Sequence, residues 1–128
     1  MIKPQYTAGI VTTDRIVVPS VYITAFSVSP SYWADIPGQF KVFIDRCTPW
    51  CNTHEPHAKL TCGKKGYTIA LRTGPSMPEC ERVIGSIEHF HGHLEIESCG
   101  KLGLCSVEHK EDVAGRIDEI TQFCTMIG

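Results

Sequence analysis

The chain has 128 residues, 42% of them hydrophobic and 20% charged, which predicts one globular domain over residues 1–128 and excludes a disordered chain. Its net charge of −2 averages two unlike halves: residues 1–75 carry eight Lys and Arg against four Asp and Glu, and residues 76–128 carry four against ten. This balance, with one short basic turn at Lys64 and Lys65, excludes a typical nucleic-acid binder.

The start of the chain lacks the charged and apolar regions of a secretion signal, so we expect a cytoplasmic protein. No apolar run approaches the roughly 20 residues that cross a bilayer, which predicts no membrane partner. The seven cysteines are then expected to be reduced, and most of them to be buried as small hydrophobic residues.

Strands are expected where β-branched and aromatic residues gather between turn signals. These segments are residues 6–13, 21–29, 39–46 and 67–73. In the third segment Phe40, Val42 and Ile44 occupy alternate positions, which is the period of a half-buried strand. A further short strand at residues 58–62 is expected to form a hairpin with the fourth segment across the turn at residues 63–66.

The first helix is expected to begin after Ser76, which can form a capping box with Glu79, and to end near Gly92. Apolar residues recur at helical spacing between these limits. They are Cys80, Val83, Ile84, Ile87 and Phe90. A short strand is expected to follow at residues 94–98.

Gly100 and Gly103 are expected to break the chain before the last helix, which Ser106 can cap. The predicted apolar stripe of that helix consists of Val113, Ile117, Ile120 and Cys124. Strands followed by helix, strand and helix predict an α+β fold. We expect a single domain with an antiparallel or mixed sheet of about five strands, covered on one face by two helices.

Two groups of side chains have the chemistry of metal ligands. The first contains Cys47, Cys51, His54 and His57, and the second contains His89, His91 and His93. Thiolates and imidazoles bind zinc tetrahedrally, but the spacing of the first group matches no standard zinc finger. The alternatives are a polar loop with one or two buried thiols, and partly exposed histidines at a helix end. We expect no metal or other cofactor, and we keep a small zinc-binding or metal-dependent protein as an alternative.

No arrangement typical of a catalytic nucleophile and no glycine-rich nucleotide-binding motif occurs, so we expect no catalytic residue. The remaining signal is a set of carboxylates in the acidic half. Its members are Glu95, Glu97, Glu108, Glu111, Asp112, Asp118 and Glu119. They form either a solvated face or a surface that attracts a basic partner. Trp50 either packs on the edge of the sheet or anchors an interface.

The order of features from Val21 to Ile87 resembles the eighth family of immunity proteins of bacterial polymorphic toxins. The matching segments are residues 21–30, 40–50, 66–73 and 79–87, and the second of them ends in Cys47-Thr48-Pro49-Trp50. The resemblance implies a cytosolic protein that neutralises one toxin of contact-dependent growth inhibition, often a nuclease, by covering an essential surface. It implies no catalytic activity.

The predicted function is therefore that of an immunity protein whose acidic residues contact the toxin, with Trp33 and Trp50 as candidate anchors of the interface. A metal-dependent protein is the first alternative. The second is an accessory binding protein of a phage or mobile element. The sequence makes no prediction for the oligomeric state.

Overall fold

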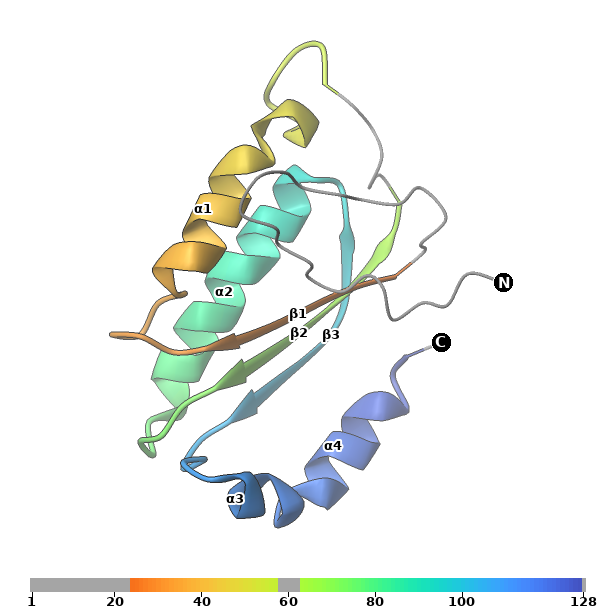
Figure 1. Ribbon diagram of the computed structural model, residues 1–128. Helices are drawn as coiled ribbons and strands as arrows, with labels where there is room; N and C mark the ends of the chain where they lie inside the picture. Colours follow the sequence, from red (N-terminus) through yellow and green to blue (C-terminus); the bar gives the residue numbers. More distant parts are fainter. Residues whose placement is uncertain (1–23, 58–62, 128) are drawn as a thin grey trace.

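The structure, a computed structural model, describes residues 24–57 and 63–127. Within these ranges, parallel strands form one sheet in the order β1-β2-β3 (Figure 1). The strands are β1 (Thr24–Pro30), β2 (Lys65–Leu71) and β3 (Glu97–Leu104). The helices are α1 (Gly38–Arg46), α2 (Met77–His93), α3 (Lys110–Ala114) and α4 (Ile117–Cys124), with a short 3-10 helix at Thr48–Trp50.

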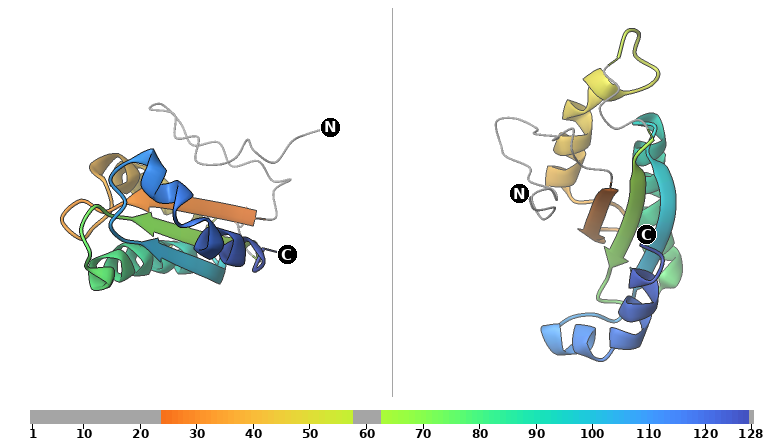
Figure 2. Two further views of the ribbon diagram at one scale, coloured as in Figure 1. Left: turned by 90° about the horizontal axis from the view of Figure 1, so that it is seen from below. Right: turned by 90° about the vertical axis from the view of Figure 1, so that its right-hand side faces the viewer.

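The helices that connect the strands, α1 and α2, cover the same face of the sheet (Figures 1 and 2). Strand order follows chain order, so both connections step in one direction, and right-handed crossovers then place both helices on one side. Helix α4 returns to the opposite face, where the ring of Phe123 meets the ring of Tyr67 at a centroid distance of 6.2 Å. The described sheet therefore has helices on both faces.

Helix α2 lies close to the sheet because the residues beneath it are small. Ala70 of β2 packs against Cys80. A Cβ atom at Gly66 would lie 2.9 Å from Nδ1 of His91, and one at Gly103 would lie 3.2 Å from Cβ of Cys80. Larger residues at these positions of the strands would push the helix away from the sheet.

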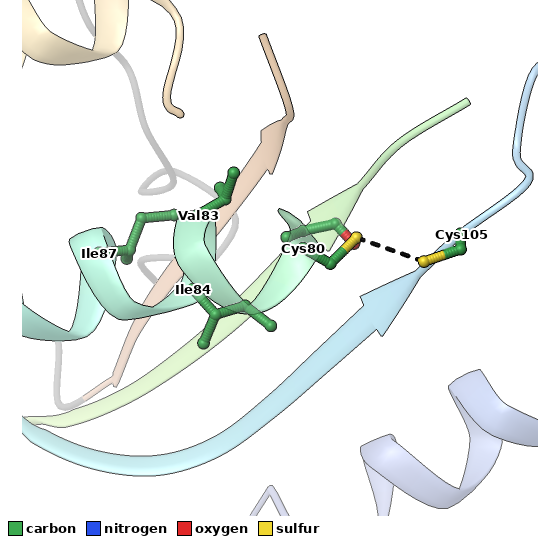
Figure 3. Packing of buried hydrophobic residues seen from close by; sticks show 6 residues of the cluster. Cys80, Val83, Ile84, Ile87 and Cys105 are labelled. Atoms are coloured by element: carbon green, nitrogen blue, oxygen red, sulfur yellow. Dashed lines mark hydrogen bonds between the residues drawn. The ribbon is translucent and has the colours of Figure 1, made fainter. Parts of the chain in front are cut away.

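The side chains buried between α2 and the sheet form two clusters. The first contains Ala70, Cys80, Val83, Ile84, Ile87 and Cys105 (Figure 3). The second contains Cys47, Phe90, Leu94 and Ile96. The predicted helix in this region is confirmed, and every position of its predicted apolar stripe is buried. The expected capping box does not form, because Ser76 makes no side-chain hydrogen bond to the helix and Glu79 pairs with Arg72.

The strand predicted at residues 39–46 is wrong, since these residues lie in α1. Phe40 and Phe43 are one helical turn apart, and both rings contact the ring of Phe90. Val42, which the alternating pattern places beside Phe40, is 52% exposed. A short apolar segment fits both periods, and the contact with α2 favours the helix.

The predicted antiparallel or mixed sheet is also wrong, because the described strands are parallel to one another. The strands predicted at residues 21–29 and 67–73 are confirmed as β1 and β2. Residues 21–23 lie outside the described residues, and β2 begins and ends two residues earlier than predicted. The predicted strand at residues 6–13 and the predicted hairpin strand at residues 58–62 lie outside the described residues. In the part that is described, β2 pairs in parallel with β1 on one side and with β3 on the other.

The strand predicted at residues 94–98 begins later and is longer than expected, because β3 includes Gly100 and Gly103. Gly100 allows a close approach rather than a break: a Cβ atom there would lie 3.0 Å from Cδ1 of Tyr67. The last predicted helix is divided into α3 and α4 at Gly115. None of the helices in the described part combines the length and apolar character that crossing a membrane requires.

Candidate functional site

The parallel strands end together at one edge of the sheet, here called the carboxyl edge. The register pairs Pro30 with Leu71, and Leu71 with Leu104, which are the last residues of the strands. The segments that follow the strands are residues 31–37, 72–76 and 105–109. Ligands of open parallel α/β sheets bind outside the carboxyl ends of the strands. We therefore place the candidate site at this edge.

A tight turn at residues 32–35, here called the aromatic turn, follows β1. Tyr32 and Asp35 exchange backbone hydrogen bonds of 2.8 and 3.0 Å, and Trp33 and Ala34 have φ angles of 55° and 62°. Such angles at both central residues are typical of a type I′ turn and cost a bulky residue about 1–3 kcal/mol. Ala34 is buried, whereas Trp33 is 100% exposed. The turn therefore holds an indole ring in solvent beside the carboxyl edge.

Backbone hydrogen bonds join the segments that follow β2 and β3. The N–H of Val107 donates to the carbonyl of Arg72 at 3.0 Å, and the N–H of Ser106 donates to the carbonyl of Gly74 at 3.0 Å. Arg72 also forms an ion pair with Glu79 in the first turn of α2. Its Nε atom is buried and has no hydrogen-bond partner among the described residues. The backbone hydrogen bonds join residues 72–76 and 105–109 into one unit, here called the connected support, which includes the guanidinium group of Arg72.

The amino-terminal ends of α1 and α2 point toward the same edge, because each helix follows a strand that ends there. Helix α1 begins at Gly38 after Pro37, and α2 begins at Met77 after Ser76. Neither preceding residue makes a side-chain capping hydrogen bond in the described structure. The first N–H groups of α1 and its dipole favour an anion at this edge, whereas the first turn of α2 contains Pro78, which has no N–H, and the carboxylate of Glu79.

Carboxylates beyond β3 are engaged by neighbouring groups of the chain. The carboxylate of Asp112 accepts hydrogen bonds from the N–H groups of His109 (2.8 Å) and Glu108 (2.9 Å), and these bonds lower the pKa of Asp112. Glu119 accepts hydrogen bonds from the guanidinium of Arg116, which lowers the pKa of Glu119. Both carboxylates therefore have local structural roles.

The predicted acidic surface is divided between the two ends of β3. Glu95 and Glu97 lie at the start of the strand. The other members, Glu108, Glu111, Asp112, Asp118 and Glu119, follow its end. An eight-residue strand spans about 26 Å, so these carboxylates do not form one continuous patch. Trp50 is half-buried and packs against the second core cluster. That any of these residues contacts a partner stays a prediction.

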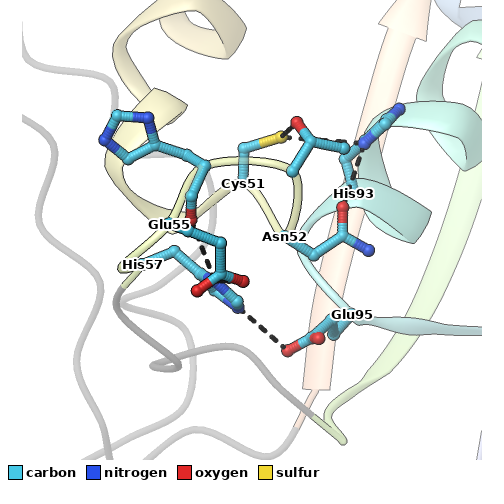
Figure 4. Close-up of polar contacts among 8 residues, drawn as sticks. Cys51, Asn52, Glu55, His57, His93 and Glu95 are labelled. Atoms are coloured by element: carbon cyan, nitrogen blue, oxygen red, sulfur yellow. Dashed lines mark hydrogen bonds and ion pairs between the residues drawn. The ribbon is translucent and has the colours of Figure 1, made fainter.

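The first predicted metal-binding group is not assembled. Its members are Cys47, Cys51, His54 and His57. Cys51 Sγ lies 3.6 Å from Nδ1 of His93, and His57 Nε2 lies 3.7 Å from the carboxylate of Glu95 (Figure 4). Cys47 is buried in the second core cluster, which raises its pKa to about 12. Among the residues that the structure describes, no three or more His, Cys, Asp or Glu side chains are arranged to hold a metal ion.

The second predicted group is divided by the helical twist of α2. His91 is buried, with Nε2 2.9 Å from Oγ of Ser27, and burial lowers its pKa to about 4. His89 and His93 are one turn apart on another side of the helix, with their Nε2 atoms 3.1 Å apart. The histidine run therefore does not form the predicted metal site.

A cavity of about 690 Å³ lies between α1 and α2, and its lining includes Asp35 of the aromatic turn but not Trp33. Its apolar wall includes Phe90 and Leu94. Polar side chains that line it contact one another, since Lys41 pairs with Asp45 at 2.5 Å. The cavity thus adjoins the aromatic turn, and the fully exposed Trp33 keeps the carboxyl edge as our candidate site.

The sequence pattern does not single out Tyr32 or Arg72 as site residues, and it names Trp33 only as a candidate anchor of a protein interface. Their signal is positional, because each lies within three residues after the end of a strand. That signal requires the strand direction, which is hidden when residues 39–46 are read as a strand instead of a connecting helix.

No family model and no curated protein matches the chain. Solved structures do match it. The Trp repressor binding protein of Bacillus subtilis has a TM-score of 0.68 and 19% identity, over 85% of this chain and 66% of that protein. The general stress protein 14 of Treponema denticola, in complex with FMN, has a TM-score of 0.63 and 14% identity, over 84% of this chain and 68% of the other.

An FMN-dependent NADH-azoreductase from Bacillus anthracis, also in complex with FMN, has a TM-score of 0.57 and 14% identity, over 80% of this chain and 55% of the other. The chain thus spans from about half to about two thirds of the length of these proteins.

These likenesses contradict the predicted resemblance to immunity proteins, because the neighbours are flavodoxin-like proteins, several of them oxidoreductases. The toxin-neutralising function, its alternatives as a metal-dependent or accessory protein, and the expectation of no enzymatic activity are contradicted with it. The parallel sheet, the helices on both of its faces and the structural matches together show that the described residues have a flavodoxin-like α/β fold.

Proposed function

We propose that the chain binds flavin mononucleotide at the carboxyl edge and contributes to a flavin-dependent oxidoreductase. The observation that carries the proposal is the aromatic turn, which holds the fully exposed ring of Trp33 beside this edge in a strained backbone conformation. Strain of this kind persists where surrounding structure imposes it, and it is concentrated at ligand sites.

The position of the aromatic turn agrees with the topology. In the flavodoxin-like strand order, FMN binds where the order of the strands reverses. Within the described sheet, strand order and chain order agree from β1 to β3, so the order does not reverse between these strands. A further strand that reversed the order next to β1 would place the reversal point beside the turn that follows β1.

The residues at the carboxyl edge fit the chemistry of the cofactor. The planar isoalloxazine ring would stack on the indole of Trp33, because aromatic rings favour offset stacking. The anionic phosphate would be held by N–H groups at the amino-terminal end of α1, whose first turn contains no acidic residue. Arg72 lies at the same edge, with its guanidinium paired to the carboxylate of Glu79. A bound flavin supplies hydride transfer between a reduced pyridine nucleotide and an acceptor.

The proposal is tested by titrating FMN with the full chain and following the quenching of flavin fluorescence. Stacking on one aromatic ring contributes about 1–3 kcal/mol, so Trp33→Ala should weaken FMN binding about ten- to hundred-fold. Trp33→Phe, which keeps an aromatic ring, should retain most of the affinity. Val42→Ala, an exposed position on α1, serves as the matched control and should bind FMN like the unmodified chain.

Riboflavin lacks the phosphate, so the difference between its affinity and that of FMN measures how much the phosphate contacts contribute to binding. We expect it to bind more weakly than FMN to every variant. Absence of FMN binding by the full chain, or equal affinity for the unmodified chain and Trp33→Ala, would contradict the proposed site. Oxidation of NADH that depends on added FMN tests the catalytic part of the proposal.

A further inference from the structure

Cys80 and Cys105 bring two thiols into contact beneath the carboxyl edge. Cys80 lies in the first turn of α2, and Cys105 follows the last residue of β3 (Figure 3). Their Sγ atoms are 3.8 Å apart, although the residues are 25 positions apart in the sequence. A disulfide requires an S–S distance of about 2.05 Å, so bond formation needs a further approach of about 1.8 Å.

The packing around the pair brings the helix close to the strand. A Cβ atom at Gly103 would lie 3.2 Å from Cβ of Cys80, so the absence of a side chain at Gly103 lets the first turn of α2 approach β3 closely. Cys80 Sγ also lies 3.8 Å from the carbonyl oxygens of Ala70 and Leu104. The two thiols are therefore fixed between the ends of both strands.

We propose that Cys80 and Cys105 form a redox-active dithiol, which a small disulfide converts reversibly into an intramolecular disulfide between α2 and the end of β3. The product would tie the first turn of α2 to the segment after β3. That segment carries Ser106, which is hydrogen-bonded to Gly74 in the connected support of the carboxyl edge. The proposal does not depend on flavin binding.

The exposures of the two thiols set the order of the reaction. Cys105 is 7% exposed and Cys80 is completely buried, so Cys105 meets the oxidant first. The Cys105 thiolate attacks one sulfur of the small disulfide, forms a mixed disulfide and releases one small thiolate. Cys80 then loses its proton and attacks the Cys105 sulfur, which forms the intramolecular bond and releases the second small thiolate. The protein loses two electrons and two protons, and the small disulfide is reduced to two thiols.

The second step should be slow at neutral pH. Burial is the largest cause that raises the pKa of Cys80, and it still acts after Cys105 has formed the mixed disulfide, when the hydrogen bond and charge of the Cys105 thiol are lost. Only the thiolate attacks, and its fraction rises about tenfold per pH unit below the pKa. Closure of the disulfide should therefore accelerate nearly tenfold for each unit of pH between about pH 7 and 9.

The test equilibrates the full chain with oxidised and reduced glutathione, alkylates the free thiols after unfolding, and maps the linked peptides by mass spectrometry. A peptide that links Cys80 to Cys105 should accumulate as oxidised glutathione increases and disappear again on reduction. A variant with Cys51, Cys62, Cys99 and Cys124 replaced by Ser should give the same linked peptide at the same ratio of oxidised to reduced glutathione.

Single substitutions separate the two steps. Cys80→Ser should accumulate the mixed disulfide of glutathione on Cys105, because the resolving thiol is missing. Cys105→Ser should leave Cys80 alkylated, because a completely buried thiol does not meet the oxidant. Absence of the linked peptide at equilibrium with excess oxidised glutathione, in both the unmodified chain and the variant with four replaced cysteines, would overturn the proposal.

Discussion

At the scale of the single residue, His91 couples stability to pH. Its ring is buried, contacts Ser27 at 2.9 Å, and has a pKa lowered by burial from 6.5 to about 4. Above pH 6.5 the ring is neutral in both the folded and the unfolded chain, so it adds no pH dependence. As the pH falls from 6.5 to 4, the unfolded chain binds a proton that the folded chain excludes. The free energy of unfolding should then fall by about 3 kcal/mol over this range.

Replacing His91 tests this coupling. His91→Gln should destabilise the fold at pH 7, since it loses packing in the core. At pH 4.5 the cost of the substitution should be smaller by about 2–3 kcal/mol, because glutamine does not titrate. The measurement is urea unfolding of both proteins at both pH values. His54→Gln, at an exposed position, is the control and should change stability little at either pH. An equal cost of His91→Gln at both pH values would contradict the role of His91.

The position of His91 also shows a limit of prediction from sequence: the residue types alone do not indicate which histidine of the run is buried. His89, His91 and His93 are two positions apart, which places them on one face of a strand but on different sides of a helix. The surrounding apolar stripe predicts the helix correctly, and α2 is observed. The rotation of the helix against the sheet then buries His91 and leaves His89 exposed. That rotation depends on packing against residues far away in the sequence, which no local pattern contains.

At the scale of the element, the strand predicted at residues 39–46 and the observed helix α1 bury different side chains. If residues 39–46 formed a strand, Val42 would share the buried face with Phe40. In the helix, Phe43 instead shares the buried side, with its ring 6.1 Å from the ring of Phe90. Phe43→Ala should therefore cost about 2 kcal/mol, less than a fully buried phenylalanine, because Phe43 is half-buried.

Val42→Ala is the matched comparison for Phe43→Ala. Val42 is 52% exposed, so its truncation should change the free energy of unfolding by less than about 0.5 kcal/mol. Urea unfolding of the two variants measures both changes. The reverse order, with Val42→Ala the more costly substitution, would support the strand and contradict α1.

At the scale of the whole molecule, the direction of the strands could not be read from the sequence. The positions of β1 and β2 are predicted well, because β-branched and aromatic residues mark them. A parallel sheet is recognised by alternating strands and helices, and that alternation is lost once α1 is read as a strand. With α1 assigned correctly, the order from β1 to α2 indicates connected βαβ units and points to the carboxyl edge as the binding site.

Helix α4 packs against the second face of the sheet through its buried residue, Phe123. Phe123 is 2% exposed, and its ring meets Tyr67 edge to face at 6.2 Å. Tyr67 in turn donates a hydrogen bond from its hydroxyl to the carbonyl of Met126. Phe123→Ala removes the buried ring and should cost about 3–5 kcal/mol, either by unfolding the domain or by releasing α4 from the sheet.

The sequence-based prediction for the last helix placed Ile117 on the buried stripe, yet it is 55% exposed. Ile117→Ala is therefore the control and should change stability by less than about 0.5 kcal/mol. Thermal unfolding measures the overall loss, and limited proteolysis near Met126 reports local release of α4, which would be cut early in Phe123→Ala while the sheet stays protected. Equal stability of the two variants would mean that α4 does not cover this face of the sheet in solution.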